Sequence, residues 1–173
     1  MIFLRHPRPD KASGLCYGWT DLDIGPDGTA EIARALETTP KVARVIASPA
    51  LRCRRLAEEL AARDNVALHF EPRLWELNFG VWEGVPWAKI GRDISDVWAS
   101  DPWNIAPPQG ETFAAVHARV GAVLADAAPG TALVCHAGPI RVARMILTGA
   151  GFETVFAEPV PYASPIRFVR EVV

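Results

Sequence analysis

Residues 1–10 read Met1-Ile2-Phe3-Leu4-Arg5-His6-Pro7-Arg8-Pro9-Asp10. Residues 2–4 form a short, unbroken apolar run, which is typical of a strand buried on both faces of a sheet. Pro7 disfavours the helical region for His6, so we expect the chain to stay extended there and then to leave the sheet. Ligands bind at the carboxyl ends of strands in open α/β sheets. Arg5 and His6 are therefore candidate binding-site residues.

The composition is that of a globular protein, because half of the 173 residues are hydrophobic and 22% are charged. The length suits one domain that spans residues 1–173. A net charge of −2 argues against the basic surface that binds nucleic acid or an anionic membrane. We expect neither as a partner, and we expect a monomer or a homodimer. Arginines make 15 of the 18 basic residues, and their planar fork suits phosphate and carboxylate ligands.

The N-terminus and the cysteines bear on the location of the protein. Arg5 interrupts the apolar N-terminus too early for a signal peptide. No apolar run approaches the roughly 20 residues that a bilayer-spanning helix needs. Cys16, Cys53 and Cys135 are odd in number and widely spaced, which predicts neither a disulfide framework nor a metal site. We therefore expect a cytoplasmic protein whose three thiols are reduced and buried or half-buried.

Apolar segments with strand and helix patterns alternate along the chain. After the first strand, we expect strands at residues 42–47, 66–70, 131–135 and 166–173. We expect helices at residues 27–38, 50–63, 87–99, 111–127 and 139–147. Ser48 is predicted to cap the second helix, and the aromatic segment 73–84 is predicted to be irregular. This alternation predicts a single three-layer α/β domain, with a mostly parallel sheet flanked by helices, strand 131–135 at its centre and strand 166–173 at an edge.

Three of the predicted strands end at residues that can bind an anion. The first delivers Arg5 and His6, and the second is followed by Arg52 in the first turn of the next helix. The strand at 131–135 ends at His136, and the backbone N–H of Ala137 then opens a helix. Parallel strands bring these ends to one edge of the sheet. Arginines and a helix N-terminus bind a phosphate by charge, hydrogen-bond donors and dipole together.

Four sequence blocks, in their order and spacing, resemble the histidine phosphatase superfamily, the phosphoglycerate mutase-like proteins. They are Leu4-Arg5-His6, Ala47–Arg52 (ASPALR), Leu74–Gly84 (LWELNFGVWEG) and Val134–Gly138 (VCHAG), and they span about residues 1–145. The loop 14–22 and the segment 108–112 are similar, more loosely, to α-ribazole phosphatase-like members. The resemblance implies the phosphoglycerate mutase-like fold. It also implies hydrolysis of a small phosphorylated metabolite, with α-ribazole 5′-phosphate among the candidates.

The resemblance implies a phosphohistidine mechanism with two principal residues. His6 is the expected nucleophile, with one ring nitrogen attacking phosphorus and the other donating to a backbone carbonyl. Glu76 is the expected general acid for the leaving alkoxide and then the base for the hydrolytic water. Glu83 competes with Glu76 for this role. The spacing to the following glycine favours Glu76, and Glu83 is then assigned to the turn 82–84.

The resemblance also implies a phosphate-binding set. Its expected members are Arg5, Arg52, His136, the backbone of Ala137, and Arg8 as a third cation. We expect no metal and no cofactor, because arginine and histidine supply the positive charge. His69 and His117 are read as structural or exposed, and Cys135 as core filler rather than a nucleophile. Five tryptophans within residues 75–103 are read as a packed cap whose 73–87 half borders the pocket.

The chain departs from the family pattern directly after the catalytic histidine, where Pro7-Arg8-Pro9 replaces the usual glycine, acidic or amide residue, and hydroxyl. Pro7 keeps the carbonyl that can orient His6, whereas Pro9 removes a hydroxyl. Two alternatives therefore stay open beside the phosphatase. One is a phosphoglycerate-type mutase, against which the shortness of the chain argues. The other is a catalytically inactive phosphate-binding module, against which the five intact site residues argue.

Overall fold

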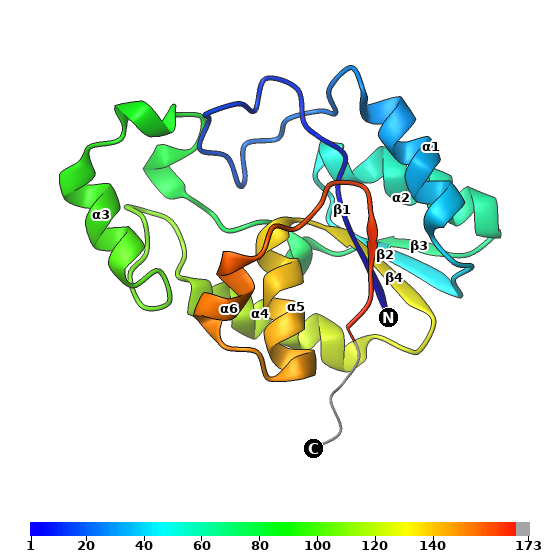
Figure 1. Ribbon diagram of the computed structural model, residues 1–173. Coiled ribbons are helices and arrows are strands. Elements are labelled where there is room, and N and C mark those ends of the chain that lie inside the picture. The colour runs from blue at the N-terminus through cyan, green and yellow to red at the C-terminus, as the bar shows by residue number, and fades with distance from the viewer. Residues whose placement is uncertain (169–173) are drawn as a thin grey trace.

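The computed structural model describes residues 1–168 and contains one five-stranded sheet with the order β3-β2-β4-β1-β5 (Figure 1). The strands are β1 (Ile2–Arg5), β2 (Arg44–Ala47), β3 (Leu68–Phe70), β4 (Thr131–Cys135) and β5 (Pro165–Ile166). The first four are mutually parallel, and β5 pairs antiparallel with β1. The predicted central position of 131–135 and the edge position of the last strand are confirmed. Residues 169–173 of that predicted strand lie outside the described residues.

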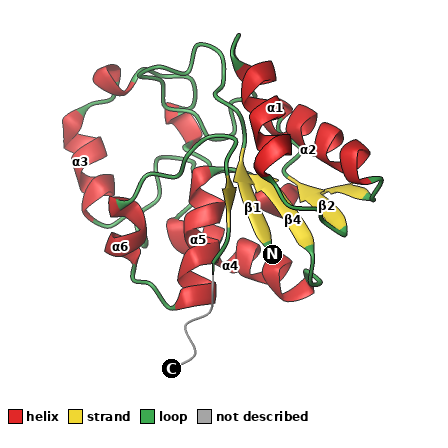
Figure 2. Cartoon of the chain, turned by 45° about the vertical axis from the view of Figure 1, so that its right-hand side comes forward, coloured by secondary structure: helices red, strands yellow, loops and turns green. Residues whose placement is uncertain are grey.

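Residues 1–168 contain six α-helices, four of which cover the two faces of the sheet and complete the predicted three layers (Figure 2). The six helices are α1 (Gly28–Thr38), α2 (Leu51–Asp64), α3 (Arg92–Ser100), α4 (Phe113–Asp126), α5 (Ala137–Thr148) and α6 (Phe152–Ala157). Figure 2 shows α1 and α2 on one face of the sheet, and α4 and α5 on the other. No helix in the described part of the chain combines the length and the apolar character needed to cross a membrane.

The alternation of side chains along β1 and β4 divides the core into two layers. Ile2 and Leu4 point into the layer under α1 and α2, whereas Phe3 points into the layer under α4 and α5. In β4, Val134 joins the first layer and Cys135 the second. Both strands are covered on both faces, which explains why their sequences are continuously apolar.

The structure corrects two local predictions and adds one helix that the sequence did not predict. The helix expected from residue 87 begins only at Arg92, because Ile90 and Gly91 have extended backbone angles and a short 3-10 turn occupies 87–89. Helix α6 was not predicted, since its six residues with one buried side chain, Val155, are too short to show a helical period. Ser48 does not cap α2, whose N-cap is Ala50 without a side-chain cap. The irregular character of segment 73–84 is confirmed, with only short 3-10 turns.

The sheet register brings three polar residues out at one edge. Arg5 pairs with Cys135 and Ala47 with Val134, so that His6, Ser48 and His136 leave the sheet side by side. Backbone hydrogen bonds extend each pairing by one step, from His6 N to Cys135 O and from Ser48 N to Val134 O, both 2.9 Å. The loop after β1 and the segment that carries α3 lie beyond this edge in Figure 1.

Candidate active site

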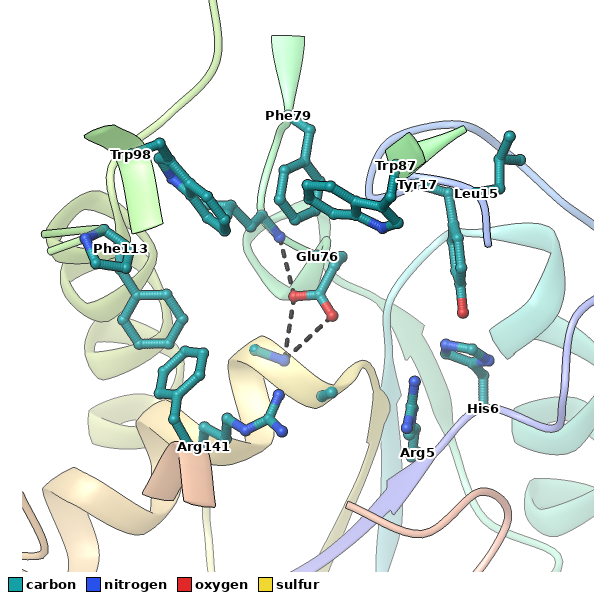
Figure 3. A pocket seen from close by; sticks show the side chains of 15 residues that line it. Arg5, His6, Leu15, Tyr17, Glu76, Phe79, Trp87, Trp98, Phe113 and Arg141 are labelled. Carbon is teal, nitrogen blue, oxygen red and sulfur yellow. Dashed lines mark hydrogen bonds between the residues drawn. The ribbon is translucent and has the colours of Figure 1, made fainter. Parts of the chain in front are cut away.

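A cavity of about 360 Å³ lies against the carboxyl end of β1 and the N-terminus of α5 (Figure 3). Its polar wall consists of Arg5, His6, Tyr17, Glu76 and Arg141, and the backbone of Ala137 and Gly138 lies beside them. The remaining wall is apolar and largely aromatic, with Leu15, Leu77, Phe79, Trp87, Trp98, Pro102, Phe113 and Phe156. The predicted nucleophile and general acid therefore face the same space.

The His6 ring is held in one tautomer by the backbone. Its Nδ1 lies 2.7 Å from the carbonyl oxygen of Pro7, and only a protonated Nδ1 can donate to that oxygen. The ring is almost completely buried at the cavity wall. Burial, together with the charges of Arg52 and Arg5, keeps the pKa of His6 well below its usual value of 6.5. The ring is therefore neutral at pH 7, with Nε2 as the unprotonated nitrogen.

Arg5 is fixed beside His6 by a tyrosine and a main-chain carbonyl. Its Nη1 donates to Val160 O at 2.8 Å and its Nη2 to the Tyr162 hydroxyl at 3.0 Å. The guanidinium carbon lies 3.8 Å from the centroid of the Tyr162 ring. The Nε of Arg5 is buried and has no hydrogen-bond partner among residues 1–168. A buried donor without a partner is costly, so this N–H is a position that an anion's oxygen can satisfy.

Arg52 and His136 lie behind the cavity wall and are fully buried. Arg52 donates to Thr20 O at 3.0 Å, to Gly18 O at 2.6 Å and to His136 Nδ1 at 3.2 Å. These bonds use three of its five N–H groups, so two donors remain. The guanidinium is thereby held by the loop that follows β1.

His136 contacts Arg52 and Ser48 through its two ring nitrogens. Because Nδ1 accepts from Arg52, the proton of the neutral ring is on Nε2, which lies 2.8 Å from Ser48 Oγ. The ring also stacks on Trp75 at 6.1 Å. Burial and the charge of Arg52 lower the pKa of His136 well below 6.5. In this arrangement His136 orients Arg52, and its predicted direct bond to a phosphoryl oxygen stays a prediction.

The positive charge at this edge of the sheet is not neutralised by carboxylates. Within residues 1–168, no carboxylate oxygen lies within 4.0 Å of a guanidinium nitrogen of Arg5 or Arg52. Arg5 and His6 line one end of the cavity with Arg52 and His136 buried behind them, and Ala137 lines it at the positive end of α5. This charge balance favours an anion at that end.

The Glu76 carboxylate is positioned by the N-terminus of α5. Both of its oxygens lie 3.1 Å from Gly138 N, and Oε1 also accepts from Leu77 N at 3.0 Å (Figure 3). A Cβ on residue 138 would collide with this carboxylate, which explains the glycine there. The N-terminus of α5 thus binds the Glu76 carboxylate through Gly138 N and also borders the predicted anion site through Ala137.

The main chain around Glu76 is held by Arg119, which pairs with Glu111; the sequence did not reveal this ion pair. Arg119 donates to the carbonyls of Arg73, Trp75 and Glu76 at 2.6–2.9 Å. Its charge is balanced by Glu111 at 2.7 Å, both groups being mostly buried. Arg119 and Glu111 therefore set the position of the segment that carries the acid.

Glu83, the alternative acid, does not line the cavity. Its carboxylate accepts hydrogen bonds from the backbone of Gly18, Trp19, Thr20 and Phe79, and from the Thr20 hydroxyl, at 2.6–3.1 Å. These bonds, which outweigh the effect of burial, hold the pKa of Glu83 below its usual value. Glu83 therefore fixes the loop whose carbonyl oxygens accept from Arg52. The sequence assigns it only to packing of the turn 82–84.

Arg8 is not brought to the cavity. Its side chain is 68% exposed and lies 3.9 Å from Glu31, and its guanidinium carbon lies 5.5 Å from the centroid of the Tyr162 ring that stacks on Arg5. A cation that does line the cavity is Arg141 on α5, and the phosphate contact expected of Arg8 stays a prediction. Tyr17 and Tyr162 were also missed; their hydroxyl oxygens lie 3.4 Å apart beside Arg5. Tyr17 directly precedes Gly18 in the loop that resembles the family, which was the only available signal for it.

None of the three cysteines lines the cavity, whereas two of the tryptophans do. All three cysteines are free and buried, as predicted, and burial raises the pKa of Cys53 to about 12 and that of Cys135 well above its usual value. Such thiols are poor nucleophiles. Residues 1–168 contain no group of three or more His, Cys, Asp or Glu side chains placed to hold a metal ion. Trp87 and Trp98 line the cavity and pack on Phe79, so the aromatic cap borders the pocket.

Comparison with known proteins agrees with this geometry. The family model of the histidine phosphatase superfamily (branch 1) matches residues 1–171. A Hydrogenobacter thermophilus protein named "Putative phosphoserine phosphatase 2" is 26% identical over 90% of this chain and 82% of its own. The α-ribazole phosphatase of Shigella flexneri superposes with a TM-score of 0.83 at 20% identity, covering 94% of this chain and 86% of that one.

A mycobacterial glucosyl-3-phosphoglycerate phosphatase superposes with a TM-score of 0.79 at 23% identity, covering 91% of this chain and 82% of that one. Both superpositions confirm the predicted fold. The family model accounts for nearly the whole chain. This chain therefore belongs to the histidine phosphatase superfamily and is a phosphatase enzyme.

Proposed function

We propose that this enzyme hydrolyses the phosphomonoester of a small metabolite through a phosphohistidine at His6. The observation that carries the proposal is the unneutralised pair Arg5 and Arg52 beside a neutral, tautomer-fixed His6. A phosphoryl group supplies the negative charge that this end of the cavity lacks. It also supplies an acceptor for the buried Nε of Arg5.

In the first step, His6 Nε2 attacks phosphorus in line with the ester oxygen. The N–P bond forms as the P–O bond to the leaving group breaks. The leaving oxygen takes a proton from Glu76, the carboxyl group that lines the same cavity as His6. Arg5, Arg52 and the N–H of Ala137 stabilise the charge on the three non-bridging oxygens. The Pro7 carbonyl stabilises the positive charge that develops on the ring.

In the second step, water attacks phosphorus and the N–P bond breaks. Glu76, now a carboxylate, takes the proton of that water, and His6 recovers its free Nε2. The arginines supply the positive charge in both steps, so the proposed reaction needs no metal ion or cofactor. The mutase alternative uses the same chemistry, and the same residues serve it.

The leaving group occupies the aromatic half of the cavity. The rings of Phe79, Trp87 and Trp98 suit an apolar or planar body of limited size. α-Ribazole 5′-phosphate, with its aromatic base, remains one candidate for this reason. A volume of about 360 Å³ fits a small metabolite rather than a phosphoprotein, in keeping with a cytoplasmic metabolic enzyme.

Two measurements test the proposal. The first is steady-state hydrolysis of p-nitrophenyl phosphate and of a panel of phosphometabolites that includes α-ribazole 5′-phosphate. The second is rapid acid-free quenching after reaction with a ³²P-labelled substrate, followed by peptide mapping, because phosphohistidine is alkali-stable and acid-labile. Turnover with label on His6 supports the proposal. Binding of phosphate without turnover supports the inactive-module alternative, and phosphoryl transfer to a second hydroxyl of the substrate supports the mutase.

A further inference from the structure

The cavity contains a second cationic position, separate from the predicted phosphate site. Arg141 follows Ala137 by four residues on α5, so both lie on the same face of that helix. Ala137 is at the phosphate end of the cavity, and Arg141 lies one turn deeper along the wall. In Figure 3 its guanidinium points into the cavity, with Glu76 between it and His6.

The guanidinium of Arg141 is held in place by neutral groups only. Its Nε donates to Val155 O at 3.1 Å and its Nη2 to Glu158 O at 3.4 Å. The guanidinium carbon lies 4.7 Å from the ring centroid of Phe156. Across residues 1–168, no carboxylate oxygen comes within 4.0 Å of this side chain, and its Nη1 has no protein acceptor. The charge is therefore positioned but not paired.

The surroundings make an unpaired charge costly. Phe113, Phe156 and Trp98 form the nearby apolar wall of the cavity, and burial lowers the pKa of Arg141 while Glu76 opposes that change. An ionic interaction is stronger next to apolar walls than in water. A small anion that reaches Nη1 would gain a charge-assisted hydrogen bond in such a place.

We propose that Arg141 binds a carboxylate of the leaving group, so that the preferred substrate is the phosphate ester of a small hydroxy acid. The inference rests on the phosphomonoesterase function proposed above and narrows its substrate class. A carboxylate fits better than a second phosphate, because a single guanidinium with one free nitrogen balances one negative charge rather than two. Arg5 and Arg141 then bind the two ends of the substrate, and Glu76 faces the ester oxygen between them.

The test uses substrate pairs that differ only in the carboxylate. One pair is 3-phosphoglycerate and glycerol 3-phosphate, and the other is O-phosphoserine and O-phosphoethanolamine. The measured quantity is the ratio of kcat/KM within each pair. We expect the wild type to favour the carboxylate member by at least about tenfold. Arg141→Met should remove this preference, and Arg141→Gln, which keeps hydrogen-bond donors without charge, should remove most of it.

Two further variants complete the design. Arg141→Lys keeps the charge and should retain part of the preference. Arg144→Met is the matched control, because Arg144 lies on the same helix but pairs with the Glu158 carboxylate at 2.5 Å and does not line the cavity. It should leave the ratio unchanged. An equal loss on both members of a pair in Arg141→Met would show that Arg141 acts on the chemistry or the fold, and would overturn the proposal.

Hydrolysis of p-nitrophenyl phosphate by the same preparations separates the two proposals. A wild type that is inactive on this ester contradicts the phosphatase mechanism itself. A wild type that hydrolyses it but shows no carboxylate preference contradicts only the role of Arg141. Preference for α-ribazole 5′-phosphate over every hydroxy-acid ester would also overturn the carboxylate site, because that ester has no carboxylate.

Discussion

The Nδ1 of His6 lies 2.7 Å from the carbonyl oxygen of the next residue, Pro7. This bond decides which ring nitrogen is the nucleophile, because a protonated Nδ1 leaves the lone pair on Nε2. Proline has no N–H but keeps its carbonyl. The replacement of the family's usual glycine by Pro7 therefore preserves the group that orients the ring. This favours an active enzyme over an inactive binding module.

Replacement of His6 by alanine tests the nucleophile. His6→Ala should lower kcat by at least about 10³-fold, a barrier increase of about 4 kcal/mol, because among residues 1–168 His6 is the one histidine that lines the cavity. Stopped-flow or steady-state assays measure the loss, and circular dichroism checks that the variant is folded. Alkali-stable ³²P label should appear on His6 in the wild type only. Label on Cys135 or Ser48 would contradict the mechanism.

Acidification should destabilise the protein through its two buried histidines. The pKa values of His6 and His136 are held below 6.5 in the folded state, whereas the unfolded chain has ordinary values. Below about pH 6.5 the unfolded state therefore binds more protons than the folded state. The stability gained from these two groups is fully present above that pH and is lost as the pH falls through the lowered values, by up to about 1.4 kcal/mol per pH unit for each histidine.

Urea unfolding between pH 8 and pH 5, in buffer without phosphate, measures this effect. His136→Asn should make the free energy of unfolding less dependent on pH in that window. His69→Asn is the control, because His69 is exposed on the edge strand β3, and it should leave the slope unchanged. A slope that is the same in wild type and His136→Asn would refute the assignment of a neutral buried ring.

Two glutamate variants distinguish the general acid from the carboxylate that supports the loop. An alkoxide leaving group needs a proton, whereas p-nitrophenolate does not. Glu76→Gln should therefore slow single-turnover phosphorylation by an alkyl phosphate about 10²–10⁴-fold, and by p-nitrophenyl phosphate far less. Glu83→Gln should have a milder effect, similar for both substrates, since it loosens the loop at residues 18–20. Exchange of these two phenotypes would identify Glu83 as the acid.

A methyl group at position 138 should have the signature of a displaced acid. Gly138→Ala would place a Cβ against the Glu76 carboxylate. We expect a loss of at least about tenfold on alkyl phosphates and a smaller loss on p-nitrophenyl phosphate. Gly121→Ala in α4 is the matched control, since its Cβ would lie 3.4 Å from Ile146 and the substitution favours the helix. Equal losses on both esters would place the effect at the phosphate end instead.

Removal of divalent metal ions should not reduce activity. Arg5 and Arg52 supply two positive charges where the phosphoryl group is expected to bind, and both keep unused N–H donors. Dialysis against EDTA, followed by assay in metal-free buffer, should leave kcat within about twofold of its original value, well inside the change expected from losing one catalytic interaction. Loss of activity that Mg²⁺ or Zn²⁺ restores would mean that a metal supplies this charge.

The part of the site that lies at strand ends could be predicted from the sequence. An apolar run that stops at a charged residue is a local signal, and the parallel sheet then brings several such stops to one edge. His6, Arg5 and Ala137 reach the cavity in this way, and Arg52 lies directly behind them. Arg8, which was proposed as a third cation from the departure after His6 and not from a strand end, does not line the cavity; it pairs with Glu31 and lies 5.5 Å from the Tyr162 ring.

Residues that act across long sequence separations could not be predicted. Arg119 lies 43 residues from Glu76, whose carbonyl it binds, and Tyr162 lies 157 residues from Arg5. Arg141 has the periodicity of an ordinary helix surface residue, and only its packing against the segment 155–158 turns it into the cavity. No sequence pattern indicates these contacts, because each depends on how loops fold over the sheet.

The first turn of α5 has an evolutionary consequence. Ala137 and Gly138 are adjacent, so the phosphate end of the cavity and the general acid are attached to neighbouring peptide units. The separation of these two peptide units is set by covalent geometry, which does not change when distant side chains are exchanged. The aromatic wall comes from other segments of the chain, including Phe79 and Trp98. New leaving groups can therefore be accommodated by mutation of that wall while the spacing required for phosphoryl transfer is inherited intact.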